Sequence, residues 1–251
     1  MSIIKLSSIK IQLIIFLACF AILLSIKDKD IAFLVTTFVA TISAIAIDSS
    51  FIFLKEKKFK INDSSIISGL IIGFVLYSRQ PLWIFLLASL FGIGSKHLIK
   101  IKGRHLFNPA AFGIFITTIF FAAPTQWKGT FLWYILVPFG VYFSYKISKL
   151  QVLTGYFLTT LFLFGAQALV QRVPLLDIFG YLSFFYIFVM VIEPKTTPVK
   201  PPGKLIFGAG LALLIFILTQ AGVKFDAELS SLLALNLSVP LLNKIPQRRW
   251  I

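Results

Sequence analysis

The sequence predicts an all-α integral membrane protein with about ten transmembrane helices, arranged as two inverted five-helix repeats. Three observations support this. Hydrophobic residues make up 58% of the 251 residues, apolar runs near the length of a membrane span recur along the whole chain, and basic residues concentrate in alternate loops. No stretch as long as a soluble domain separates the runs. We therefore expect one integral membrane domain over residues 1–251 in the lipid bilayer.

The apolar runs define the expected helices. A short basic segment precedes the first run, as in a signal peptide, but Lys27-Asp28-Lys29-Asp30 follows it in place of small residues. This segment offers no cleavage site, so we expect the first helix to be retained. The ten runs are 11–26, 31–54, 65–78, 82–95, 108–123, 130–147, 151–170, 176–192, 204–221 and 228–243.

The basic residues predict the orientation of these helices. The net charge of +15 is more consistent with charged membrane loops than with a nucleic-acid partner. With the N-terminus on the cytoplasmic side, the cytoplasmic loops hold 18 of the 24 Lys and Arg residues. This excess supports ten spans in the cell (inner) membrane, with both termini cytoplasmic. The six basic residues outside are Lys27, Lys29, Arg79, Lys128, Arg172 and Lys224.

Ten spans divide into two halves, about 1–125 and 126–251, which an odd number of helices per half makes antiparallel. The third run is short and contains Gly69 and Gly73, and the corresponding eighth run ends at Glu193-Pro194. Interrupted spans at matching positions indicate a site near the bilayer midplane. A tilted helix or a locally thinner membrane explains a short span equally well.

A polar, basic segment from Lys96 to Ala111 joins two of the runs. Asn108 is suited to cap the following helix, and Pro109 is suited to its first turn. One interpretation is a cytoplasmic loop with a good helix start. The other is a loop that holds an anionic or ring-shaped ligand, whose phosphate would be attracted by the loop's basic residues Lys96, Lys100, Lys102 and Arg104.

Asp48 is a carboxylate inside a predicted span, and such residues are candidates for cation or proton handling. Ser49 and Ser50 could hydrate it, and the alternative is that Asp48 lies at the cytoplasmic interface. Glu193, at a membrane edge, needs a basic partner, which Lys195 or the segment 96–105 could supply.

Neither a metal site nor an internal disulfide is expected. His97 and His105 have no Cys or carboxylate at ligand spacing, and Cys19 is the single cysteine. The chain also lacks the sequence motifs of nucleotide-binding loops and of common hydrolases.

Two separate groups of motifs, in order along the chain, resemble the NqrB/RnfD family. Members are membrane subunits of ion-pumping NADH:quinone and ferredoxin:NAD oxidoreductases. The first group is Asp63-Ser64-Ser65, Ser68-Gly69-Leu70, Pro81-Leu82-Trp83, Lys96-His97, Gly103 and Phe107-Asn108-Pro109-Ala110; the second is Glu193-Pro194-Lys195-Thr196-Thr197-Pro198, Gly203 and Phe207-Gly208-Ala209-Gly210.

The resemblance implies ten helices in two inverted halves, partner membrane subunits and a flavin. Family members attach FMN covalently to the last Thr of a Ser/Thr-Gly-Ala-Thr motif. Here Thr154-Gly155-Tyr156-Phe157 lacks that Thr, so the expectation is non-covalent FMN or riboflavin and no catalytic residue. The candidate cofactor-binding residues are Ser68, Gly69, Lys96, His97, Gly103, Asn108, Pro109, Glu193 and Thr196, with Asp48 as the ion-path candidate.

The predicted function is thus a membrane subunit that couples electron transfer to cation transport. It would need partner subunits, because the chain has no nicotinamide site. The alternative is a small-solute or vitamin transporter without redox activity, since inverted five-helix repeats are equally a transporter design. A structural scaffold in a larger complex is a third interpretation.

Overall fold

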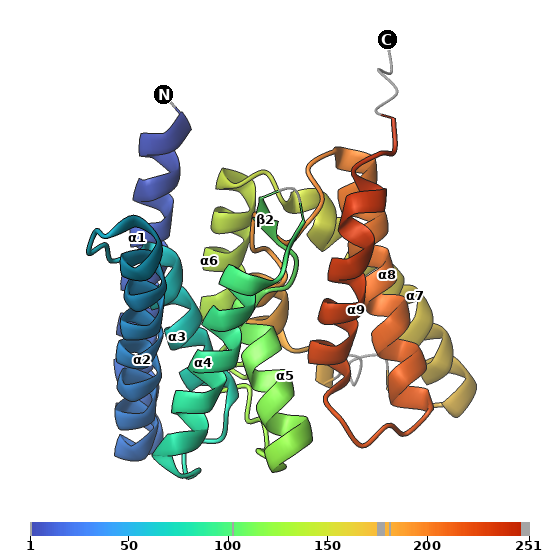
Figure 1. The fold of residues 1–251 in the computed structure, drawn as a ribbon. Helices are drawn as coiled ribbons and strands as arrows, with labels where there is room; N and C mark the ends of the chain where they lie inside the picture. The colour runs from blue at the N-terminus through green and yellow to red at the C-terminus, as the bar shows by residue number, and fades with distance from the viewer. Residues whose placement is uncertain (1, 102, 175–178, 181, 247–251) are drawn as a thin grey trace. The chain divides into compact units, whose positions relative to one another are not determined.

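The computed structural model describes residues 2–101, 103–174, 179–180 and 182–246. The chain divides into two compact units, which meet in the sequence at Phe131 and Leu132, and each unit is helical (Figure 1). The first contains α1 (Ser2–Asp28), α2 (Ile31–Glu56), α3 (Asp63–Val75), α4 (Leu82–Leu98), β1 (Lys100–Ile101), β2 (Arg104–His105) and α5 (Pro109–Phe121); the second contains α6 (Trp133–Lys146), α7 (Leu150–Gln171), η2 (Tyr186–Met190), α8 (Pro201–Gln220) and α9 (Ala227–Leu242).

Helix α2 lies at the centre of the first unit, where it packs against α3 and α4. Two glycines of α3 allow the close approach. A Cβ on Gly73 would lie 2.5 Å from the Thr37 Cα of α2, and a Cβ on Gly69 would overlap Thr41. Small residues are the usual means of bringing membrane helices this close. The contact fixes the start of α3 beside the C-terminal half of α2, where Asp48 lies.

Both short helices of the first unit are followed by extended segments that pair with each other. Leu76 and Thr125 form an antiparallel bridge, and the Tyr77 N–H donates to the Pro124 carbonyl over 3.0 Å. These bonds satisfy main-chain groups that would otherwise be exposed in the bilayer, where irregular backbone is tolerated only with such partners.

The second unit is built around the pair α7 and α8, which pack closely at two glycines. A Cβ on Gly155 would overlap the Leu205 carbonyl, and a Cβ on Gly208 would overlap the Val152 carbonyl. Before α8, the chain forms the short π-helix η2, whose residues are all buried. Single π-turns of this kind occur frequently at functional sites.

The helical character of the sequence prediction is confirmed. Each of the ten predicted runs contains helix, although the described part of the eighth is helical only over residues 184–190. Among the described residues, four helices are long and apolar enough to cross a membrane: Ile9–Asp28, Ile31–Glu56, Leu150–Gln171 and Pro201–Gln220. Many large apolar side chains of these helices face outward, such as Phe38 at 66% and Phe162 at 74% exposure. Outward-facing apolar surface of this extent indicates a membrane protein.

Two details differ from the prediction, and the inverted ten-helix repeat and the single domain stay predictions. The chain is not purely α-helical, because Lys100–Ile101 and Arg104–His105 pair as a small antiparallel hairpin. Gly103 forms its turn with a φ of +76°, a conformation that glycine adopts at low cost. In addition, α4 continues through Lys96 and His97, which were expected in the loop.

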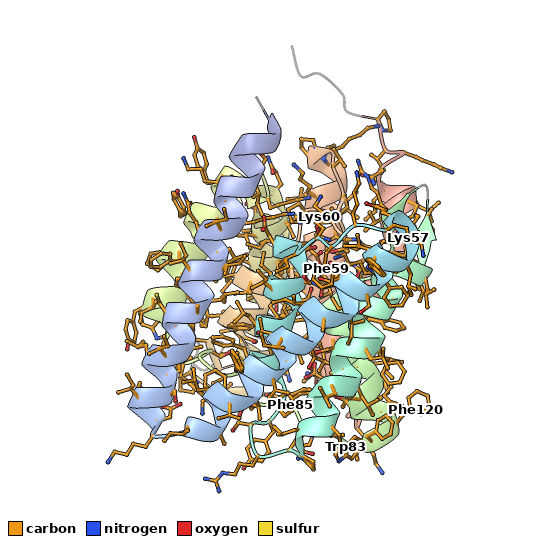
Figure 2. The ribbon with its side chains drawn as sticks, turned by 60° about the vertical axis from the view of Figure 1, so that its left-hand side comes forward. Lys57, Phe59, Lys60, Trp83, Phe85 and Phe120 are labelled. Carbon is orange, nitrogen blue, oxygen red and sulfur yellow. The ribbon has the colours of Figure 1, made fainter. Side chains whose placement is uncertain are left out.

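Polar and aromatic residues mark the two ends of the first unit. Figure 2 shows Lys57 and Lys60 at the end where α2 finishes, and Trp83 at the opposite end, near the start of α4. Lysines and tryptophans are typical of membrane interfaces.

Candidate functional site

Asp48 lies completely buried near the C-terminal end of α2, about 12 Å before the last residue at 1.5 Å rise per residue. Its carboxylate has three side-chain donors. Oδ1 accepts from the Lys96 Nζ at 2.8 Å and lies 2.7 Å from the His97 Nε2, and Oδ2 accepts from the Asn62 Nδ2 at 2.8 Å. A buried carboxylate requires such partners, because the loss of hydration is otherwise too costly.

The last turn of α4 supplies both basic side chains of this site. Lys96 and His97 are neighbours in the sequence, and both reach Asp48 although they leave the helix in different directions. The Lys96 ammonium also donates to the Ser64 Oγ at 2.9 Å. The His97 ring stacks on the Phe51 ring, with centroids 4.7 Å apart and an interplanar angle of 8°. This stacking fixes the imidazole against α2.

The start of α3 supplies the polar groups. Asn62 occupies the N-cap position of α3, yet its side chain makes no capping hydrogen bond and donates to Asp48. Ser64 lies in the first turn of the same helix. We define the buried ion-pair cluster as Asp48, Asn62, Ser64, Lys96 and His97. The predicted neighbours Ser49 and Ser50 do not join it, because their hydroxyls donate to the carbonyls of Lys60 and Ala46.

The buried ion-pair cluster combines a fixed carboxylate with two groups that can carry positive charge. Lys96 balances the charge of Asp48, and His97 can bind or release a proton in the physiological pH range. Oxygen atoms of Asp48 and Ser64 are suitable ligands for a hard monovalent cation. The arrangement can therefore hold, exchange or relay a positive charge. The sequence prediction missed Asn62 and Ser64, although both lie in the polar stretch that precedes α3.

The other predicted residues of the first unit have local roles. Asn108 caps α5, as predicted, because its Oδ1 accepts from the Ala111 N–H at 3.0 Å. Pro109 is in the first turn, Ser68 donates to the Ser64 carbonyl, and Gly69 packs on α2. Gly103 is the exposed turn of the hairpin, and Lys102 lies outside the described residues.

Glu193 and Thr196 belong to the second unit, in the turns between η2 and α8. The Thr196 carbonyl accepts from the buried Asn236 at 3.0 Å, and the Glu193 carbonyl accepts from Thr197 at 2.9 Å. Thr196 is 1% exposed, and its hydroxyl has no hydrogen-bond partner among the described residues. Such a group is unusual in a folded protein and marks a place where a polar ligand or water would be accommodated.

Three lysines hold this segment through main-chain carbonyls. Lys149 donates to Pro198 at 2.9 Å, Lys200 to Ile245 at 3.0 Å, and Lys204 to Ser148 at 2.6 Å. Lys149 and Lys204 are buried, at 4% and 7% exposure. The proline-rich segment is thus a rigid part of the second unit, and its conformation does not depend on prolines alone.

A second ionic group joins the loops at the opposite end of the first unit. Lys128 binds Asp30 at 3.0 Å and Asp28 at 3.1 Å, and Ser78 donates to Asp30 at 2.9 Å. Burial by itself would raise the pKa of Asp30, but the hydrogen bonds from Lys128 and Ser78 lower it below the usual range. Burial likewise opposes the charge of Lys128, and the two carboxylates outweigh this effect and raise its pKa.

Similarity to known proteins agrees with this architecture. The chain is 24% identical over 282 residues to a subunit of the ion-translocating oxidoreductase complex of Actinobacillus succinogenes, and the match covers 78% of this chain and 79% of that protein. It is 31% identical over 87 residues to the subunit of the same name from Shewanella amazonensis, and that match covers 35% of this chain and 25% of that protein.

The family assignment comes from a match over nearly the entire sequence. The model of the NQR2, RnfD, RnfE family matches residues 2–136 and 130–251. The two matches include the buried ion-pair cluster of the first unit and the Thr196 segment of the second. The chain therefore belongs to the NQR2, RnfD, RnfE family.

Proposed function

We propose that this protein is a membrane subunit of an ion-translocating oxidoreductase complex, in which Asp48 takes part in moving the cation. The observation that carries the proposal is the fully buried Asp48 carboxylate within α2, held by Lys96 and His97. Intramembrane carboxylates with basic partners typically belong to ion or proton pathways. Relatives that are named as subunits of such complexes support the same assignment.

The complex would divide the work between subunits. This chain offers a buried, exchangeable charge, and partner subunits would supply the electron donor and acceptor sites. A purification of the tagged chain from its native membranes tests the division. We expect other membrane subunits to copurify, and we expect deletion of the chain to abolish cation uptake driven by electron transfer in membrane vesicles. A chain that purifies alone, with uptake intact after deletion, would contradict the proposal.

A bound flavin is a separate part of the proposal. The predicted cofactor residues of the first unit do not favour one, because Ser68, Lys96 and His97 already bind protein groups and Gly69 is covered by Thr41. Support comes from the second unit, where the buried Thr196 hydroxyl could hydrogen-bond to non-covalent FMN or riboflavin. When bound, the flavin would supply the electron-transfer chemistry.

An absorption spectrum of the detergent-purified protein tests for the flavin. Flavin bands that acid precipitation releases into the supernatant would support non-covalent binding, and Thr196→Val should reduce their intensity. A colourless protein that transports a solute into liposomes would instead favour the transporter alternative.

A further inference from the structure

We propose that the Lys96 ammonium occupies a site for a monovalent cation and that Na⁺ competes with it for Asp48. The inference rests on the proposed role of Asp48 in cation movement and goes further by naming what the cation must displace. The ammonium would act as a tethered substitute, which keeps the buried carboxylate neutralised whenever the transported ion is absent.

The position of the Lys96 Nζ is that of a cation among oxygen atoms. It lies 2.8 Å from the Asp48 Oδ1 and 2.9 Å from the Ser64 Oγ. A carboxylate and a hydroxyl are the kinds of oxygen ligand that hard cations prefer. The single carboxylate of the buried ion-pair cluster matches a single positive charge.

Ammonium and cation exclude each other at this position. One carboxylate cannot neutralise two buried positive charges, and like charges a few ångströms apart repel strongly in a poorly hydrated site. Exchange of one for the other, in contrast, leaves the net charge of the buried ion-pair cluster unchanged. Competition is therefore the arrangement that avoids both an uncompensated carboxylate and an excess positive charge.

The geometry allows Lys96 to leave while the carboxylate stays in place. Lys96 is in the last turn of α4, next to the exposed Lys100–Ile101 strand, and its stem is flexible. Asp48 keeps its hydrogen bonds to Asn62 and His97 after the ammonium moves, and Phe51 holds the His97 ring. The remaining donors would hold the carboxylate in its present orientation for the incoming ion.

The first test replaces the ammonium with a neutral group in the full chain, purified in detergent. We expect the unfolding temperature of Lys96→Gln to rise with added NaCl but not with choline chloride at equal ionic strength, because a ligand of the folded state stabilises it. Asp48→Asn/Lys96→Gln should show no such rise. Equal responses of Lys96→Gln to the two salts would overturn the proposal.

The second test uses the wild-type chain, so it does not depend on whether Lys96→Gln folds. A lysine-modifying reagent is applied with NaCl or choline chloride, and the labelled positions are read by mass spectrometry. Na⁺ should increase the labelling of Lys96 several-fold and leave the exposed Lys58 unchanged. Labelling of Lys96 that is the same in both salts would overturn the competition. Both tests need only the isolated chain, so they can fail while the assignment to a redox complex stands.

Discussion

At the scale of the single residue, charge compensation around Asp48 is the dominant feature. The carboxylate is 0% exposed, and each of its oxygens is paired with at least one donor. Removal of one member of a buried ion pair costs more than removal of both, because the remaining charge is left without compensation. Stability measurements on variants can therefore show whether Lys96 carries the compensating charge.

Lys96→Met should destabilise the protein by about 3–5 kcal/mol, because it leaves the Asp48 carboxylate buried without its main counter-charge. The double variant Asp48→Asn/Lys96→Met should be more stable than Lys96→Met alone. Denaturant or thermal unfolding in detergent measures both. Lys58→Met, on the exposed surface, is the matched control and should change stability by at most about 0.5 kcal/mol. Equal effects of Lys96→Met and Lys58→Met would contradict the ion-pair account.

Asn108 can be separated into a capping role and a ligand-binding role. Asn108→Ala should cost about 1 kcal/mol, because the Ala111 N–H loses its acceptor. Asn108→Ser keeps a capping oxygen and should be close to wild type in unfolding experiments. If the flavin bands weaken in Asn108→Ser while its stability is unchanged, Asn108 contacts the flavin as well. Identical stability of Asn108→Ala and wild type would contradict the capping role.

Asp30 predicts how stability depends on acid pH. Its pKa is lowered in the folded protein, so the folded state binds the proton less readily than the unfolded chain. The stabilisation is present above the ordinary aspartate pKa of about 3.9 and is lost as the pH falls below it. Asp30→Asn can still cap α2, so its unfolding temperature should fall less steeply with acid than that of wild type. Parallel curves would contradict the prediction.

At the scale of the secondary-structure element, close helix packing explains several glycines that the sequence alone presented as site candidates. Gly69 was predicted to bind a cofactor, and in the structure it lies against the backbone of α2. The same residue type serves both purposes in membrane proteins, and spacing along the chain does not separate them. Helix ends were similarly hard to predict: α4 extends three residues past its apolar run, because Lys96 and His97 find a buried carboxylate there.

Gly92 and Gly94 of α4 provide a direct test of this packing. A Cβ on Gly92 would lie 2.5 Å from the Pro109 carbonyl, whereas a Cβ on Gly94 would have nothing within 4 Å. Gly92→Ala should destabilise the protein by roughly 1–3 kcal/mol through overpacking. Gly94→Ala should be neutral or stabilising by up to about 1 kcal/mol, since alanine favours helix. Similar unfolding temperatures for the two variants would contradict the close contact of α4 with α5.

At the scale of the whole molecule, the apolar runs predicted the helices well because membrane spans follow from composition and length. The contact between Asp48 and Lys96 could not be predicted in this way. The two residues are 48 positions apart, and their approach depends on α3 packing beside α2. Asn62 escaped notice for the same reason, since its place before a helix suggested a cap. The two-unit division lies close to the expected midpoint of the sequence.

The most direct test of the central claim is electron-transfer-driven cation uptake in vesicles that contain the complex with Asp48→Asn. The account predicts that uptake is lost, or strongly reduced per electron transferred, while the amount of assembled complex stays near that of wild type. Glu56→Gln, an exposed carboxylate on the same helix, should behave as wild type. Normal uptake by Asp48→Asn at normal electron-transfer rates would contradict the claim that this buried carboxylate handles the transported ion.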